Sequence, residues 1–236
     1  MSEPATTAVS RRAMTTRVLP FALFMAGIAV EEGVRFASHW GGSGFPAGGG
    51  YYLYPLRAIP AGALLLWFLP EYHELRLDEL RRLGRTAAVV GIGLALFVAW
   101  VLLDGRVGMG SAGAFDPAAL PDGVVRFVLI LSRAAGAVLV VPLMEEIFWR
   151  SFLIRFLVDP DFESVPAGRF NWQSFLGTVV LFGLEHHQVV AGMVAGAVYN
   201  ALLYRTRSLA LCVLAHATTN LALALYVVTT GSWQFW

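Results

Sequence analysis

Four polar clusters interrupt the apolar C-terminal half of the chain, and they contain residue types that hydrolytic enzymes use. In chain order the clusters are Glu145, Glu146 and Arg150, then Glu185, His186 and His187, then Tyr199 and Asn200, and last His216 and Asn220. A charged side chain inside a membrane segment is unfavourable unless it is paired or used, so each cluster is a candidate functional site.

The spacing inside the clusters separates their roles. Glu146 and Arg150 are four residues apart, so on a helix they share a face and can form an ion pair. Glu145 is rotated by about 100° from Glu146 and can point elsewhere. His216 and Asn220 are also four residues apart, which makes two hydrogen-bonding groups project together from one helix.

Together these groups include the residue types that peptide-bond hydrolysis requires. A carboxylate and a histidine within hydrogen-bond reach can activate a water molecule, which we expect of Glu145 and His186. Two neighbouring donors can stabilise the oxyanion of a tetrahedral intermediate, which we expect of His216 and Asn220.

Each cluster also has a purely structural explanation. Glu146 and Arg150 can form a buried ion pair without catalytic use, and the His/Asn pair can hydrogen-bond between helices. Glu185 and His187 flank His186 and are expected to be structural or to face water.

The segments that carry the clusters are predicted to lie in a membrane. Of the 236 residues, 57% are hydrophobic and 14% are charged, whereas soluble domains have roughly 25% charged residues. The mean hydropathy is +0.65. This composition predicts an all-α, polytopic transmembrane helical bundle. The net charge of +1, without a basic stripe, gives no indication of nucleic-acid binding.

Apolar segments of about spanning length predict roughly seven to eight spans. The candidates are 18–37, 51–70, 86–103, 124–158, 174–187, 189–204 and 208–230. We expect residues 1–17 to form a polar cytoplasmic tail and 18–236 a single transmembrane domain, with the protease core at about 124–230. Segment 124–158 would be about 52 Å long as one helix, and we expect a single span bent at Pro142.

The polar groups are predicted to lie at one depth. Counted from the expected cytoplasmic end of its own segment, each of Glu145, His186 and Asn220 lies 13 or 14 residues inside, which is about 20 Å along a helix. Arginines concentrate in the N-terminal tail, the 71–85 linker, the 159–173 loop and residues 205–207. Because cytoplasmic loops are enriched in basic residues, we expect the N-terminus to lie on the cytoplasmic side of the membrane.

Three motifs on separate apolar segments resemble a known family. "EEIFWR" has the form EExxxR, "FGLEH" the form FxxxH, and "HATTN" the form HxxxN. Their order and spacing resemble the CPBP intramembrane proteases, the group that includes the type II CAAX prenyl endopeptidase, for which eight spans are expected. "YYLYPLR", "EYHEL" and "TTGSWQFW" look like parts of bacterial CAAX-protease-related proteins found with exosortase and PEP-CTERM sorting systems.

The resemblance implies a core similar to the CAAX prenyl endopeptidase and roles that match those expected from the spacing. It assigns water activation to Glu145 and His186, and it assigns Glu146 and Arg150 to organising the site or engaging substrate. The His/Asn pair would form the oxyanion hole. The implied partners are the lipid bilayer, a membrane-embedded or membrane-anchored protein or peptide substrate, and components of an exosortase system.

Two mechanisms and a second class of function stay open. Glu145, His186 and His216 offer two imidazoles and one carboxylate to Zn²⁺, although the chain has no HExxH motif. The glutamate–histidine mechanism needs no cofactor and also explains Asn220 and Glu146, so we favour it. Without catalysis, the chain would be a scaffold or chaperone of a sorting system, or a small transporter or proton-coupled channel, because buried Glu/His sets also serve as proton relays.

Overall fold

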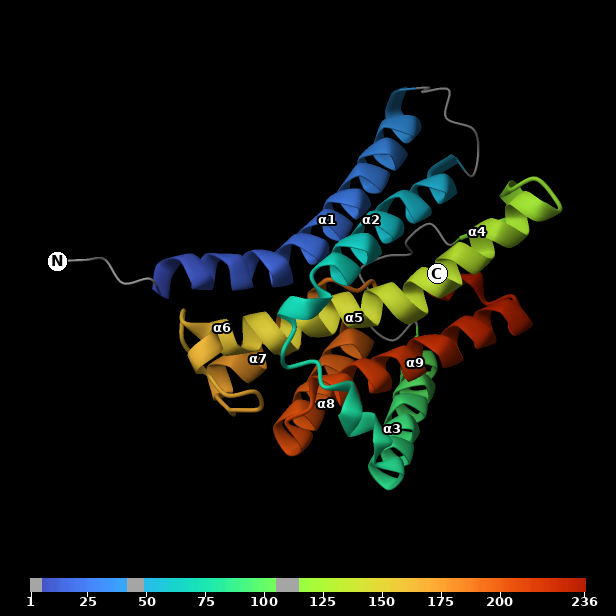
Figure 1. Cartoon of the computed structure of the whole chain (residues 1–236). Coiled ribbons are helices and arrows are strands. Elements are labelled where there is room, and N and C mark those ends of the chain that lie inside the picture. The colour runs from blue at the N-terminus through green and yellow to red at the C-terminus, as the bar shows by residue number, and fades with distance from the viewer. Residues whose placement is uncertain (1–5, 42–48, 105–114) are drawn as a thin grey trace.

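The computed structural model of the chain describes residues 6–41, 49–104 and 115–236. Those ranges contain no strand, which confirms the predicted all-α architecture. Residues 1–5 of the predicted tail lie outside them. The α-helices in Figure 1 are α1 (Thr6–Gly41), α2 (Leu53–Trp67), α3 (Leu83–Leu102), α4 (Val124–Ala135), α5 (Val141–Glu146), α6 (Ile154–Phe156), α7 (Trp172–Leu184), α8 (Val189–Thr206) and α9 (Leu209–Thr230). Short 3₁₀ segments stand at Gly49–Tyr52, Leu69–Glu71, Leu77–Arg81, Pro117–Ala119, Phe162–Ser164 and Trp233–Phe235.

Each predicted apolar segment corresponds to a helix, but the helices differ in length. Among the described residues, four stretches are long and apolar enough to cross a bilayer: Arg11–Val34, Leu83–Leu102, Val124–Phe156 and Leu209–Thr230. With 15 and 13 residues, α2 and α7 measure about 22 Å and about 20 Å, less than a hydrocarbon core of about 30 Å. The chain is an integral membrane protein, and the count of seven or eight spans stays a prediction.

Residues Val124–Phe156 form one continuous helical rod, visible in Figure 1 as α4, α5 and α6 in line. The rod passes through Pro142 without reversing, so the chain does not form two spans at that residue. Two π-helical stretches, Gly136–Val140 and Ile147–Leu153, flank the α5 turn that carries both glutamates. π-helical turns inside α-helices occur frequently at functional sites.

The rod lies at the centre of the bundle (Figure 1). α9 packs on α5 and on the first π-helical stretch, α2 packs beside α4 and α5, and α1 contacts the second π-helical stretch. α7 contacts the C-terminal end of the rod and pairs with α8, while α3 packs along α9. The elements that carry the four polar clusters are therefore neighbours in space.

Local sequence explains where α7 and α9 begin and end. The side chain of Asn171 accepts hydrogen bonds from two backbone amides in the first turn of α7. Ser208 does the same for one amide of α9. Such side chains satisfy N–H groups that have no partner in the helix itself. α9 ends at Gly231, whose φ of 71° is in the left-handed region that favours glycine.

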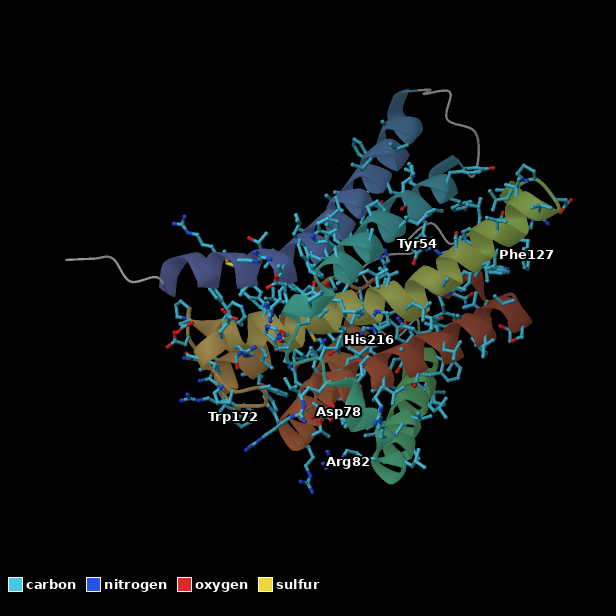
Figure 2. The ribbon with its side chains drawn as sticks, viewed as in Figure 1. Tyr54, Asp78, Arg82, Phe127, Trp172 and His216 are labelled. Carbon is cyan, nitrogen blue, oxygen red and sulfur yellow. The ribbon has the colours of Figure 1, made fainter. Side chains whose placement is uncertain are left out.

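Large apolar side chains cover the outer surface of the bundle. Trp67 is 81% exposed, Leu139 67% and Phe127 64%, and Figure 2 shows Phe127 at the periphery. Exposed apolar surface on this scale marks an interaction with lipid or with a partner. Together with the long apolar helices, it fits a bundle surrounded by hydrocarbon.

The close approach of α3 to α9 at Gly93 yields a stability prediction. A Cβ atom there would lie 2.6 Å from the carbonyl oxygen of Ala215 and 2.8 Å from the Cβ of Thr218. We expect Gly93→Ala to lower the free energy of unfolding by about 1–3 kcal/mol through overpacking. Gly91→Ala is the matched control on the same helix, because a Cβ there meets nothing within 4 Å. Thermal unfolding in detergent compares the two, and equal melting temperatures would contradict the prediction.

A charged network joins α1 to the linker after α2 and to the rod. Arg17 forms a two-pronged ion pair with Glu74, in which Nε to Oε1 and Nη2 to Oε2 both measure 2.9 Å. The hydroxyl of Ser151 donates to the same carboxylate and accepts from Arg17 Nε at 2.9 Å. Ser151 directly follows Arg150, so this network fixes the N-terminal helix against the end of the polar cluster on the rod.

Acid is expected to weaken the Arg17–Glu74 pair, whose carboxyl group lies in the linker outside the four spanning stretches. Burial raises the pKa of the Glu74 carboxyl, but the hydrogen bonds and charge of Arg17, together with Ser151, outweigh burial and lower the net pKa. A carboxyl with a lowered folded pKa stabilises the fold above its unfolded pKa, and this contribution is lost as pH falls through the folded pKa. We expect the melting temperature to decrease from about pH 4 downward.

Two substitutions test whether Glu74 causes this acid sensitivity. Glu74→Gln is expected to melt at a lower temperature at neutral pH and to lose less on acidification. Glu71→Gln is the control, because Glu71 pairs with an Arg12 side chain that is 74% exposed, and exposed pairs contribute about 0–1 kcal/mol. An acid dependence of Glu74→Gln as steep as that of the wild type would refute the assignment.

Candidate active site

The residues predicted to do chemistry come from neighbouring elements at the centre of the bundle. α5 carries both glutamates, the π-helical stretch after it carries Arg150, and α9 carries the His/Asn pair. α7 ends at Leu184, so His186 stands in the turn before α8 and not inside a helix over 174–187 as predicted. Figure 2 shows His216 near the middle of the bundle, where α9 packs on α5.

Glu146 is the buried centre of a charged network. It has 0% exposure, and its Oε1 lies 3.2 Å from Arg150 Nη1 and 2.9 Å from His216 Nδ1. The ion pair predicted from the four-residue spacing is therefore confirmed. The contact with His216 shows that Glu146 also fixes the imidazole of the neighbouring helix.

The guanidinium nitrogens of Arg150 donate hydrogen bonds to other groups of the protein. Its Nε donates to Oδ1 of Asn200 at 3.2 Å, and its Nη2 donates to the carbonyl of Gly196 at 3.3 Å. The guanidinium carbon also lies 4.5 Å from the ring centroid of Phe182, a cation–π contact. With 1% exposure, Arg150 holds the rod, α7 and α8 together, which favours the organising role over direct contact with substrate.

Glu145 differs from its neighbour, as the 100° rotation predicts. It has no ion pair with Arg150 among the described residues, and its Oε2 has no hydrogen-bond partner there although the side chain is buried. This oxygen lies 3.8 Å from His216 Nε2. A buried carboxylate oxygen without a donor is unfavourable, so the site is suited to a further polar group such as water.

Glu185 lies beside Glu145 and His186, which the sequence did not predict, and its hydrogen bond to Trp149 fits the structural role expected of it. Its Oε1 accepts a hydrogen bond from Trp149 Nε1 at 3.0 Å. One ligand atom each from Glu145, Glu185 and His186 lie within 4.8 Å of one another. His187 is exposed. The feature of the sequence that could have identified Glu185 as a site residue is its position in an apolar segment, directly before the histidine of FxxxH.

The tautomer of His186 follows from its backbone contact. Nδ1 lies 2.6 Å from the carbonyl oxygen of Phe182. A carbonyl oxygen accepts and does not donate, so in the neutral imidazole the proton is on Nδ1 and Nε2 carries the lone pair. His186 therefore offers a base nitrogen next to Glu145.

Asn220 compensates a defect in the rod. In a π-helical turn each backbone N–H donates to the carbonyl five residues earlier, as Val141 does to Gly136. The Ala137 carbonyl would therefore accept from residue 142. Pro142 has no N–H, and the side-chain amide of Asn220 donates to the Ala137 carbonyl instead, at 2.8 Å. One hydrogen of this amide is used for structure, and the other is left for the predicted oxyanion hole.

Comparison with known families adds to this geometry. Residues 126–222 match the family model of the Rce1-like type II CAAX prenyl endopeptidases. This core is similar to the Rce1-like family. The match contains all the predicted site residues and confirms the predicted relationship to the CPBP proteases, so the core indicates an intramembrane endopeptidase of the CAAX type. No curated protein and no solved structure matches the chain.

The Rce1-like core also contains positioning residues to which the sequence analysis gave no role. Besides holding Arg150, Asn200 donates to Thr178 Oγ1 at 2.8 Å. Tyr199 stacks on His216 with ring centroids 4.8 Å apart and donates to Thr219 Oγ1 at 3.1 Å. In the sequence these residues could be noticed as a tyrosine–asparagine pair inside an apolar helix. The sequence alone does not show which side chains on the other helices they contact.

The alternative zinc ligands predicted from the sequence are not gathered in the structure. Of the described residues, the group of three His, Cys, Asp or Glu side chains within 4.8 Å of one another is Glu145, Glu185 and His186. His216 is outside this group, although its Nε2 lies 3.8 Å from Glu145 Oε2. In the Rce1-like core, Glu185 thus takes the position that the zinc alternative assigned to His216.

Proposed function

We propose that the chain is an intramembrane endopeptidase that hydrolyses a peptide bond in a membrane-associated protein or peptide with water activated by Glu145 and His186. One observation carries the proposal. Glu145 Oε2 is buried without a hydrogen-bond partner among the described residues, and Glu145 offers a ligand atom within 4.8 Å of one from His186, whose Nδ1 is held by Phe182, in a core similar to the Rce1-like family. A water molecule between these two groups would donate one hydrogen to each.

The reaction is written with Glu145 as general base. As the water oxygen bonds to the carbonyl carbon, Glu145 takes a proton and the carbonyl π electrons move to oxygen. When the tetrahedral intermediate collapses, the C–N bond breaks and the leaving nitrogen receives that proton. His186 orients the attacking water through Nε2. The products are a carboxylic acid and an amine.

The oxyanion is stabilised from α9. The second amide hydrogen of Asn220 is one donor. The Nδ1–H group of His216 donates a hydrogen bond to Glu146. For Nε2 to donate a second hydrogen bond to the oxyanion, the imidazole must carry a proton on both nitrogens. Glu146 Oε1 lies 2.9 Å from Nδ1 and Glu145 Oε2 lies 3.8 Å from Nε2, and these carboxylates offset the positive charge of the imidazolium. This arrangement gives Glu146 an electrostatic role in the oxyanion hole besides its pairing with Arg150.

A divalent cation is the alternative source of activation. The donor set Glu145, Glu185 and His186 fits such an ion, which would polarise the substrate carbonyl as a Lewis acid. The metal-free mechanism is favoured because it uses the fixed tautomer of His186 together with the His/Asn pair, and both are explained without a cofactor.

The substrate and location are part of the proposal. A membrane-anchored protein would present its peptide bond at the depth of α5 and α9, and an exosortase-type sorting system is the proposed setting because of the "YYLYPLR" and "TTGSWQFW" segments. The basic N-terminal tail and linkers support a cytoplasmic N-terminus in a bacterial inner membrane.

A comparison of membrane proteomes tests the function. A strain with Glu145→Gln is expected to accumulate uncleaved precursors that the wild-type strain processes, and N-terminal and C-terminal peptide mapping would locate the cleaved bond. A strain with Glu163→Gln, an acidic residue of the loop between α6 and α7, controls for loss of a carboxylate elsewhere. Identical precursor profiles in the wild-type and Glu145→Gln strains would overturn the proposal.

A further inference from the structure

The ring of Tyr54 in α2 contacts two arginines that differ in their partners. The guanidinium carbons of Arg57 and Arg133 each lie 4.9 Å from the centroid of this ring, and Figure 2 shows Tyr54 where α2 faces α4. Arg57 pairs with Glu31 of α1, with Nη1 2.7 Å from Oε2. In the part of the chain that the structure describes, the guanidinium of Arg133 has ring contacts but no ion pair and no hydrogen bond.

Aromatic rings hold Arg133 in place and leave its donors available. Besides the Tyr54 ring, the ring centroid of Phe115 lies 5.3 Å from the guanidinium carbon. The side chain is partly buried, and none of its nitrogens is both buried and without a partner, so the donors reach the molecular surface. A guanidinium that packs on aromatic rings keeps its planar fork of N–H groups, which matches the oxygens of a phosphate.

The position of Arg133 along the rod places it near the lipid phosphates. The rod Val124–Phe156 has 33 residues and measures about 50 Å, which exceeds a hydrocarbon core of about 30 Å. With the excess divided between both ends, about 10 Å of the rod lies beyond the core on each side. Arg133 stands nine residues after Val124, about 14 Å along the helix, and its long side chain can extend to the boundary.

An aromatic cluster around Phe115 supports this depth independently. The Phe115 ring lies 5.7 Å from the Trp233 ring and 6.1 Å from the Trp236 ring, and the backbone N–H of Phe115 donates to the carbonyl of Trp236 at 3.2 Å. Tryptophan is enriched at the level of the headgroups in membrane proteins. The rings that surround Arg133 are therefore of the kind expected at the membrane surface.

The surface beside Arg133 suits acyl chains. The outward side chains of α4 in this region are large, apolar and exposed, namely Phe127, Val128 and Leu131. An unpaired charge next to hydrocarbon is unfavourable, and a ligand with a phosphate and an apolar tail would satisfy both surfaces at once.

We propose that Arg133 binds the phosphate of an anionic phospholipid whose acyl chains lie along α4. Tyr54 and Phe115 are positioning residues, because their rings hold the guanidinium. The site lies in the rod before the first π-helical stretch, and it does not depend on the proposed function.

Lipid binding to the purified full chain tests the site without an activity assay. After lipid is removed in detergent, phosphatidylglycerol is titrated and the bound lipid is counted by native mass spectrometry. We expect one phosphatidylglycerol to bind more tightly than phosphatidylcholine, because only the former headgroup has a net negative charge that offsets one guanidinium. Arg133→Gln should weaken this binding at least about 10-fold, the usual loss for a charge-assisted hydrogen bond.

Three further variants separate the features of the site. Arg133→Lys retains the charge but not the planar fork, and it should restore only part of the binding. Tyr54→Phe retains the ring and should bind like the wild type, because the Tyr54 hydroxyl is buried and does not reach a ligand. Arg126→Gln is the matched control on the same helix and should also bind normally, because Arg126 already pairs with Asp122 and donates to the carbonyl of Leu120.

Three results would overturn the lipid site. The first is phosphatidylglycerol binding in Arg133→Gln equal to that of the wild type, and the second is equal affinity of the wild type for the two lipids. The third is stabilisation of the wild type by inorganic phosphate alone as large as that by phosphatidylglycerol, which would assign the site to a free ion. Melting temperatures measured without added lipid show that each variant is folded, and their increase with phosphatidylglycerol gives a second measure of binding.

Discussion

Purified Glu145→Gln protein is expected to lose peptide cleavage by about 10²- to 10⁴-fold or more, the usual contribution of a general base. Glutamine has nearly the same shape and can hydrogen-bond to water, but its amide cannot take the proton that must leave the water oxygen. The effect should appear in kcat and not as weaker substrate binding, because the proposed role of Glu145 is to act on water. Cleavage of a precursor by protein reconstituted in liposomes measures the rate.

The same preparation must show that the variant is folded. Glu145 Oε2 has no donor in the described structure, so an uncharged amide at this position should not lower the melting temperature. Glu163→Gln should cleave at the wild-type rate. Undiminished cleavage by folded Glu145→Gln would remove the carboxylate from the mechanism.

Replacing Arg150 by methionine is expected to have the largest effect on stability. Removing one partner of a buried ion pair costs about 3–5 kcal/mol, because the other charge is left buried and unpaired. Glu146 has 0% exposure, and Asn200 and Gly196 would lose their donor as well. The free energy of unfolding in mixed micelles measures this loss.

A double-substitution cycle separates the ion pair from the packing of the long side chain. Glu146→Gln combined with Arg150→Met removes both charges, and we expect the double variant to be more stable than Arg150→Met alone. Coupling of this kind is normal for residues in one network. A destabilisation by Arg150→Met below about 1 kcal/mol, or a fully additive double variant, would contradict the network.

Features that follow from helix periodicity could be predicted from the sequence. The four-residue spacing of Glu146 and Arg150 places them on one face of any helix, and the structure shows that ion pair. The rotation of Glu145 away from that face follows from the same geometry. The helical class follows from the apolar segments, because helices satisfy their own backbone hydrogen bonds in lipid.

Features that depend on contacts between helices could not be predicted. The end of α7 at Leu184, the indole that holds Glu185 and the contact between Glu146 and His216 all depend on how the helices rotate and pack. The equal-depth estimate placed His186 and Asn220 in one layer, but it could not show that Asn220 contacts a backbone carbonyl. Spacing along one helix fixes neighbours on that helix, whereas partners across helices need coordinates.

The hydrogen bond from Asn220 to Ala137 bears on how activity can be recognised in related chains. Because Pro142 removes a backbone donor, the asparagine is needed to complete the rod even in a protein that cleaves nothing. A chain that had lost its protease activity would be expected to keep Asn220 for as long as it kept Pro142. Asparagine at this position is thus a marker of the helix defect, whereas under the proposed function Glu145 together with His186 is the marker of hydrolysis.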